Sequence, residues 1–310
     1  MRIHVDTDVA GDTDDAAALA MVLGWPGAEL VGVTTVADPD GRRAGYASHL
    51  LHLAGRGDVP VVAGAGTSAT TGREMGGLPD HAASWGDAVV PARPAPPGAA
   101  TELLAASIDL GATVAAIGPC TNLALLEEAR PGTLEAARVV VMGGWVAPPP
   151  AGLPQWGPAM DWNVQCDPVA MLTVLGTCRT PTLVTLAAGM GAHLRRRHLP
   201  TLEASGPVGR VLARQALAHE HEHDVAALAR AHPGLPDDLL NFQWDPVACA
   251  VALGWRGAPA VATRLRPRLA DGVLSFEMGA GTPADVVHAV DGRALEDRWL
   301  EAVTTVDRSG

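Results

Sequence analysis

Along the first 186 residues, short apolar runs alternate with longer amphipathic stretches. A short apolar run bounded by glycine or proline predicts a buried strand, and hydrophobic positions three or four residues apart predict a helix. The predicted strands are residues 2–5, 28–37, 59–64, 113–118, 137–144 and 180–186. The predicted helices are residues 14–24, 45–55, 100–111, 122–129 and 167–176.

This alternation predicts an α/β fold, with a mostly parallel central sheet and helices on both of its faces. Residues 64–99 and 145–166 are rich in glycine, proline and small residues, and we expect them to form long loops. No linker or internal repeat divides the chain, so we expect one domain over residues 1–310. Ligands bind such sheets at the carboxyl ends of the strands.

Composition narrows the range of partners. The net charge of −12 argues against nucleic acid, and no apolar run is long enough for a membrane span. The first residues show no signal peptide, and the four cysteines have no metal-ligand spacing. We therefore expect a cytoplasmic protein with reduced thiols.

Five aspartates follow the first predicted strand, and they are the densest charge in the chain: Asp6, Asp8, Asp12, Asp14 and Asp15. Carboxylates packed this closely repel one another unless a cation lies among them. The chain has no lysine, and no arginine lies between Arg2 and Arg42. An all-oxygen ligand set suits Ca²⁺ or Mg²⁺ better than Zn²⁺, so the motif predicts a site for a hard cation. The alternative is an acidic loop that caps a helix, which needs one or two acids rather than five.

Two other acidic motifs fit less well. An EF-hand loop starting at Asp6 would need glutamate at position 12, where Ala17 stands, and a helix before the loop. A phosphotransferase like the haloacid dehalogenases would resemble D-x-D-x-T/S, which Ala10 breaks, and it would need a basic group beside the phosphate.

Five segments in order resemble the nucleoside hydrolases, which cut the N-glycosidic bond of ribonucleosides. Residues 6–15 resemble a longer form of the motif D-x-D-P-G-x-D-D at the start of that family. The others are AIGPCTNLAL (116–125), VVVMGG (139–144), AMDWNVQCDPVAM (159–171) and FQWDPVACAVAL (242–253). Because the order and spacing match over residues 3–253, the resemblance implies a Rossmann-like nucleoside hydrolase architecture and a calcium-dependent N-ribohydrolase.

The resemblance also implies roles for individual residues. Ca²⁺ would be held by Asp8, Asp15, Asp245 and the backbone carbonyl of Thr121. Asp8 would be the general base for the attacking water, and the reaction would pass through an oxocarbenium-like state. Asp14 would hold a ribose hydroxyl, while Asp161 and Asn163 would contact the 5′ side of the ribose. Asp6 would support the loop from outside the metal shell, and Asp12 has no counterpart in the family.

The substrate side departs from the family pattern. Trp244 stands where many members have a histidine that protonates the leaving base, and stacking on Trp244 would favour a purine. Trp244 could instead be core packing beside Phe242. Trp85 is predicted as a second aromatic wall, and His81 as the one substitute proton donor.

The polar contacts to the ribose are altered as well. Asp38 and Pro39 replace the Gly-Asn pair of the family, Gln155 replaces an asparagine, and Asp161 replaces a glutamate. These changes fit a hydrolase with an unusual substrate, and they also fit a relative that only binds a ribosyl ligand through calcium. Relatives form dimers or tetramers, so a homodimer or homotetramer is expected.

A zinc peptidase is the third hypothesis. Residues 219–223 read HEHEH, so His219, Glu220 and His223 match the motif H-E-x-x-H. The stretch lies in a long helical pattern rich in alanine, leucine and arginine. We interpret it as the solvated face of a helix, placed as a lid beside the pocket.

Overall fold

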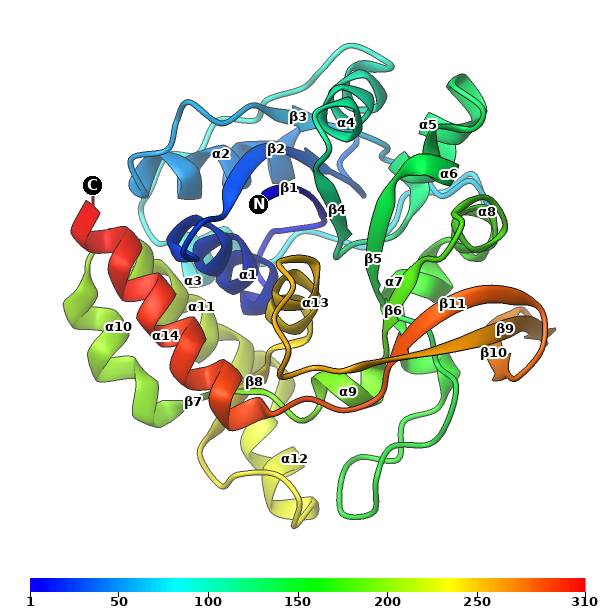
Figure 1. Ribbon diagram of the computed structural model, residues 1–310. Coiled ribbons are helices and arrows are strands. Elements are labelled where there is room, and N and C mark those ends of the chain that lie inside the picture. The colour runs from blue at the N-terminus through cyan, green and yellow to red at the C-terminus, as the bar shows by residue number, and fades with distance from the viewer. Residues whose placement is uncertain (310) are drawn as a thin grey trace.

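A nine-stranded sheet forms the centre of the computed structural model, which describes residues 1–309 (Figure 1). The strands of this sheet are β1 (Arg2–Thr7), β2 (Glu29–Thr35), β3 (Val61–Ala63), β4 (Thr113–Ala116), β5 (Arg138–Met142), β6 (Thr182–Val184), β9 (Ala260–Ala270), β10 (Val273–Met278) and β11 (Thr282–Val287). Their order is β10-β9-β11-β6-β5-β4-β1-β2-β3. All pairs from β11 to β3 are parallel, and β9 is antiparallel to both of its neighbours. The predicted α/β class with a mostly parallel sheet is confirmed.

The helices connect the strands and cover both faces of the sheet. They are α1 (Thr13–Gly24), α2 (Arg42–Leu53), α3 (His81–Trp85), α4 (Ala99–Asp109), α5 (Thr121–Ala129), α6 (Thr133–Ala136), α7 (Trp162–Cys166), α8 (Pro168–Thr177), α9 (Leu186–Gly189), α10 (Leu199–Ser205), α11 (Pro207–His223), α12 (Val225–Ala231), α13 (Trp244–Ala252) and α14 (Gly292–Ser309). Two 3₁₀ turns, η1 (Pro158–Met160) and η2 (Arg196–His198), and a small antiparallel pair, β7 (His193–Arg195) and β8 (Leu239–Phe242), complete the chain.

Alternating side chains of the strands divide the core into two layers. Val140 and Met142 of β5 pack in the layer that contains α1, α13 and α14, while Val139 and Val141 pack in the layer with α4, α5 and α8. Both faces of the sheet are thus buried, which explains why its parallel strands read as continuous apolar runs.

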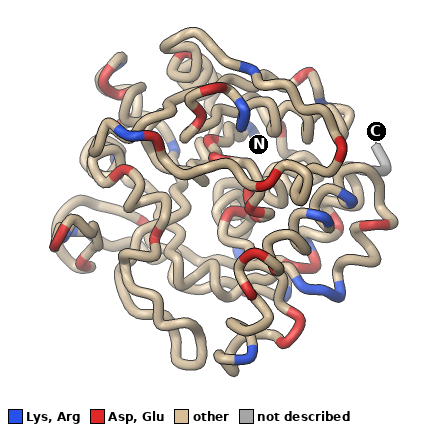
Figure 2. Tube along the Cα trace, turned by 180° about the vertical axis from the view of Figure 1, so that it is seen from behind, with Lys and Arg blue, Asp and Glu red and all other residues tan. Residues whose placement is uncertain are grey.

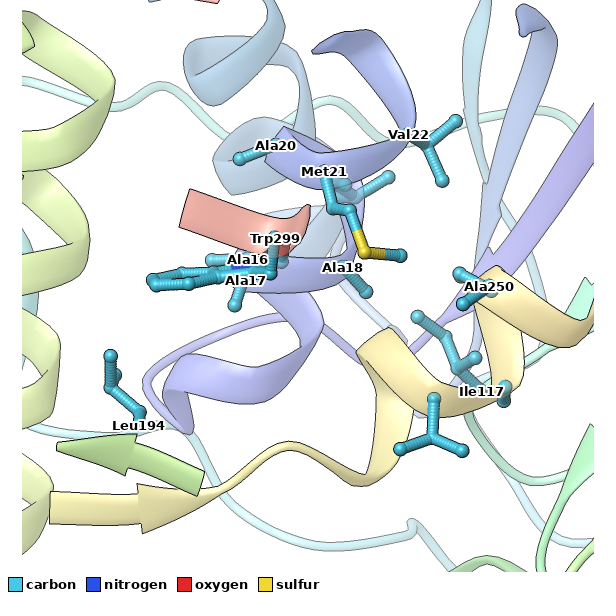
Figure 3. Packing of buried hydrophobic residues seen from close by; sticks show 14 of the residues in the cluster. Ala16, Ala17, Ala18, Ala20, Met21, Val22, Ile117, Leu194, Ala250 and Trp299 are labelled. Atoms are coloured by element: carbon cyan, nitrogen blue, oxygen red, sulfur yellow. Dashed lines mark hydrogen bonds between the residues drawn. The ribbon is translucent and has the colours of Figure 1, made fainter. Parts of the chain in front are cut away.

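Small residues allow α1 to lie close to its neighbours. Figure 3 shows the indole ring of Trp299 beside Ala16 and Ala17 of α1, and its N–H donates to the carbonyl of Ala17 at 3.1 Å. A Cβ on Gly24 would lie 2.0 Å from the carbonyl oxygen of Ala302, so only glycine permits this approach of α14. The start of α1 is therefore held in place by the packing of the rest of the helix.

The two predicted loops are partly ordered into short helices. Residues 64–99 contain α3, and residues 145–166 contain η1 and α7. The sequence pattern predicts no strand after residue 186, but the structure has the antiparallel strands β9 and β10 there. They extend the sheet at the edge farthest from β3.

Candidate active site

A cavity of about 540 Å³ lies where neighbouring parallel strands end. Strands β1 and β5 both pair with β4. Asp8 follows β1, Ile117 follows β4, and Met142 ends β5, and all three line the cavity. The cavity therefore lies at the carboxyl ends of the strands, where ligands of such sheets bind. The other lining residues are Ala10, Gly11, Asp12, Asp14, Asp15, Arg43, Gly76, Gly77, Leu78, Pro79, Trp156, Met160, Asp161, Trp162, Asn163, Leu186, His219, Glu222, His223, Trp244 and Asp245.

Three buried aspartates, here called the floor carboxylates, meet in this cavity. Asp14 and Asp15 lie in the first turn of α1, and Asp245 lies in the first turn of α13. An oxygen of each lies within 4.8 Å of an oxygen of the other two, and each residue is at most 6 % exposed. The hydroxyl of Thr7 donates to Asp15, which fixes one carboxylate from the end of β1.

Burial raises the pKa of every floor carboxylate well above its usual value. For Asp14 the next cause is Asp12, for Asp15 it is Asp8, and for Asp245 it is Asp14. Neighbouring carboxylates thus disfavour the charged form of each floor carboxylate. A cation among them reverses this effect, because it favours the deprotonated form of all three.

Asp8 is half-buried at the side of this group. A Cβ on Gly118 would lie 2.9 Å from Oδ1 of Asp8, so glycine permits the carboxylate to lie against the end of β4. Burial raises the pKa of Asp8, while the charge of Arg43 and a hydrogen bond from the Trp162 side chain lower it. Asp8 is therefore better placed than the floor carboxylates to stay charged.

Asp6 lies outside the cavity and is fully buried below the loop. It accepts hydrogen bonds from the hydroxyl of Thr34 and, at 2.7 Å, from the amide of Asn122. Burial raises its pKa to about 7 against these two hydrogen bonds. This position suits the expected role of Asp6, which is to support the aspartate loop from outside the metal shell.

Arg43 is a cavity residue that the sequence reasoning missed. Its guanidinium donates to the backbone carbonyls of Asp8, Ala37 (2.9 Å) and Gly77 (2.8 Å). It therefore joins the aspartate loop to the segment at Gly77, which also lines the cavity. Asp38 precedes α2 and accepts from the backbone N–H of Arg43 at 2.9 Å, so it orients the start of this helix rather than a ligand.

Aromatic side chains form one wall of the cavity. Trp244 and Trp156 line it, with ring centroids 6.2 Å apart, and Trp244 packs 4.7 Å from Phe242. The indole N–H of Trp244 donates to the carbonyl of Leu186 at 3.1 Å. Trp244 is thus both a cavity wall and a packing residue, so the two interpretations of the sequence are compatible.

Asp161 and Asn163 also line the cavity, but their polar atoms are engaged with the backbone. Asp161 accepts from the N–H groups of Gly144 at 2.7 Å and Val164 at 3.4 Å. The amide of Asn163 donates to the carbonyl of Ile117 at 2.9 Å. Burial raises the pKa of Asp161 to about 6, against these two backbone hydrogen bonds.

Thr121 does not line the cavity. It is the first residue of α5, where its carbonyl joins the hydrogen-bond ladder of the helix, and its hydroxyl donates to Asp167 at 2.7 Å. The backbone that reaches the cavity from this segment is at Ile117, four residues earlier. Placing the carbonyl ligand at Thr121 is therefore corrected, because the G-P-C-T turn carries the chain away from the cavity.

Trp85 and His81 also lie outside the cavity. Trp85 is 3 % exposed, stacks on Tyr46 at 4.6 Å, and donates from its indole N–H to the carbonyl of Ala10. Nδ1 of His81 lies 3.0 Å from the Tyr46 hydroxyl, and Nε2 lies 2.8 Å from the carbonyl of Ala88. Both predictions are corrected: the two side chains stabilise the loop behind the aspartate segment.

The side chain of Gln155 also bonds outside the cavity. Its amide donates to the carbonyl of Leu153 at 2.9 Å and to that of Pro150 at 3.1 Å. These bonds fold the proline-rich loop onto itself, and Gln155 does not line the cavity. Its prediction as a substrate contact is corrected for this reason.

The end of α11 reaches the mouth of the cavity with His219, Glu222 and His223. Together with Asp12, which lies just before α1, these residues are called the rim group. Asp12 is the N-cap residue of α1, but its side chain makes no hydrogen bond to the helix and accepts from the amide of Asn241 at 2.6 Å. Glu220 points elsewhere and pairs with Arg196 at 2.6 Å. The zinc-peptidase motif is therefore split, since its glutamate is engaged outside the cavity.

Comparisons with known proteins agree with this geometry. Residues 3–298 match the family described as "Inosine-uridine preferring nucleoside hydrolase". An uncharacterized protein of Schizosaccharomyces pombe is 29 % identical over 71 % of this chain and 73 % of its own length. The pyrimidine-specific ribonucleoside hydrolase RihA of Shewanella baltica is 35 % identical, and that match spans 55 % of this chain and 54 % of RihA.

Solved structures show the same fold. A purine-preferring ribonucleoside hydrolase from Gardnerella vaginalis superposes with a TM-score of 0.79 over the full length of both chains, at 19 % identity. Within residues 1–309, no helix is both long and apolar enough to cross a membrane. Given the match over residues 3–298, the chain belongs to the inosine-uridine preferring nucleoside hydrolases, enzymes that hydrolyse the N-glycosidic bond of ribonucleosides.

Proposed function

We propose that this enzyme is a calcium-dependent ribonucleoside hydrolase that favours purine nucleosides. The observation that carries the proposal is the group of floor carboxylates, whose oxygens lie within 4.8 Å of one another in the same cavity as Trp244. A hard cation and a flat base would be bound a short distance apart in this arrangement.

The residues present fit Ca²⁺. The donors in the cavity are carboxylates and backbone carbonyls, and burial holds the carboxylates where they are costly without a cation. Asp8, Asp15 and Asp245 are the proposed side-chain ligands, and the carbonyl of Ile117 takes the place first assigned to Thr121. When bound, Ca²⁺ supplies Lewis-acid activation of a water and an anchor for the ribose hydroxyls.

The side chains of this protein perform the remaining steps. Asp8 accepts a proton from the attacking water as general base. Asp14 accepts a hydrogen bond from a ribose hydroxyl and holds the sugar over the floor. The negative charge around the sugar stabilises positive charge that develops at C1′ as its bond to the base breaks.

Preference for a purine rests on the aromatic wall. Trp244 is fixed by its hydrogen bond to Leu186 and its packing on Phe242, so it offers a rigid face for stacking. A bicyclic base covers more of that face than a monocyclic one. Because RihA of Shewanella baltica is named pyrimidine-specific, both classes of base belong in the test.

The test measures free ribose released from purine and pyrimidine nucleosides, with and without a calcium chelator, alongside calcium binding. Release that the chelator abolishes and added Ca²⁺ restores, faster for purines, is the expected result. Calcium binding without release from any nucleoside would overturn the proposal and favour a protein that binds a ribosyl ligand.

A cytoplasmic homodimer or homotetramer completes the proposal. All four cysteines are free thiols, which suits a reducing compartment: Cys120, Cys166, Cys178 and Cys249. In Figure 2 the basic positions are scattered while acidic ones are more numerous, in agreement with the net charge of −12 and with a small-molecule substrate rather than nucleic acid. Light scattering after size-exclusion chromatography gives the oligomeric state.

A further inference from the structure

The residue before Asp245 is Trp244 and not a histidine, yet the leaving base must receive a proton when its N-glycosidic bond breaks. The electron pair of the C1′–N bond passes to a nitrogen of the base, and a neutral purine leaves readily only if it gains a proton. Trp244 carries no dissociable proton near neutral pH, and both nitrogens of His81 are engaged elsewhere.

The histidines that line the cavity are His219 and His223, and histidine is the side chain that most often acts as a general acid. They lie one turn apart on α11, with ring centroids 4.5 Å apart. The side chain of His219 is only 13 % exposed, whereas His223 is an exposed residue. His219 is thus the more sheltered of the two, and it lines the same cavity as Trp244.

Asp12 lies beside the ring of His219 as an ion-pair partner. Its Oδ1 lies 3.5 Å from Nδ1 of His219, and the same oxygen accepts from the amide of Asn241 at 2.6 Å. A carboxylate at Nδ1 keeps that nitrogen protonated, which leaves Nε2 to exchange a proton with a ligand. Among residues 1–309, Nε2 of His219 has no hydrogen-bond partner.

We propose that His219 is the catalytic residue that protonates the leaving base, and that Asp12 is its positioning residue. The proposal rests on the proposed function of the site. In this step the C1′–N bond breaks, its electrons move to the base, and the proton on Nε2 passes to a ring nitrogen of the purine. The water that attacks C1′ gives its proton to Asp8, so the products are neutral base and ribose.

The electrostatics of His219 define the expected pH dependence. Burial lowers its pKa most; Asp12 raises the pKa, His223 lowers it, and Glu222 raises it. A proton donor works only in its protonated form, so hydrolysis of a purine nucleoside should fall as pH rises through a value below the usual 6.5 for histidine. Removing the charge of Asp12 should move this decline to still lower pH.

The experiment compares two ribosides that differ in their need for a proton. Inosine releases a basic leaving group, while 4-nitrophenyl β-ribofuranoside releases a phenolate that is stable without protonation. His219→Gln should lower kcat for inosine about 100-fold or more and leave kcat for the nitrophenyl riboside unchanged. His221→Gln is the matched control, because His221 lies on the same helix, is exposed and does not line the cavity. It should change neither rate.

Further measurements separate proton donation from a structural role. In His219→Ala, added imidazole should restore part of the inosine activity, and Asp12→Asn should shift the alkaline decline for inosine but not for the nitrophenyl riboside. Equal loss on both ribosides, or full inosine activity in His219→Gln, would overturn the proposal. Chelator-sensitive hydrolysis of the nitrophenyl riboside by the wild type tests the proposed function independently of His219.

Discussion

The floor carboxylates and the rim group lie in one cavity but are built differently. The floor carboxylates stand in the first turns of α1 and α13, two helices that pack on each other in the core. In the rim group, Asp12 lies in a loop and the two histidines lie at the end of α11, where Asp12 and His223 are exposed. Rigid, buried positions suit the metal and ribose that every substrate shares, whereas exposed positions suit contacts that differ between substrates.

Replacement of a floor carboxylate should have the largest effect on activity. Asp245→Asn should abolish calcium binding and lower kcat/KM about 1,000-fold, because the metal accounts for several kcal/mol of transition-state stabilisation. The loss should be the same for inosine and for 4-nitrophenyl β-ribofuranoside, measured by product release together with calcium titration. Asp237→Asn is the control, since Asp237 is exposed and outside the cavity. A loss confined to inosine would contradict the division between floor and rim.

Replacement of Arg43, which joins the aspartate loop to the segment at Gly77, should have a smaller effect on activity. Arg43→Lys loses the planar group that contacts three carbonyls, so Asp8 should be less well positioned. We expect kcat/KM to fall about 10- to 100-fold with calcium affinity nearly unchanged, because small displacements of reacting groups reduce rates by this factor. Arg42→Lys, at an exposed neighbour, should have no effect. Weaker calcium binding in Arg43→Lys would instead show that Arg43 supports the metal site.

The smallest effect should be on stability rather than on chemistry. The pKa of Asp161 is raised to about 6 by burial, so its favourable contribution is present at low pH and is lost as pH rises through 6. Asp161→Asn should therefore destabilise the protein more at pH 5 than at pH 8, by a difference of about 1 kcal/mol or a few degrees in Tm. Thermal unfolding at both pH values checks this, with the exposed Asp109→Asn as control. An equal change at both pH values would show that Asp161 does not titrate in this range.

Local patterns were sufficient for most of the framework. The predicted strand at residues 137–144 corresponds to β5, because a strand buried on both faces is a continuous run of apolar residues. The predicted helix at residues 14–24 corresponds to α1, because a helix repeats its apolar positions every three or four residues. The sequence also indicated the floor in part: Asp15 and Asp245 belong to the predicted metal set, whereas Asp14 was expected to hold a ribose hydroxyl.

Only the tertiary structure decided which polar and aromatic groups face the cavity. Trp85, His81 and Gln155 lie near the aspartate loop or in its neighbouring loops, yet their polar atoms bond to backbone carbonyls and, for His81, also to the Tyr46 hydroxyl. His219 lies more than 200 residues from Asp12 in the chain, and their proximity results from the packing of α11 on α1. The sequence by itself determined the fold class, the family and the acidic floor, because these depend on local periodicity and motifs. The direction in which a loop side chain points depends on which distant backbone group is near enough to bond it, and no local pattern contains that information.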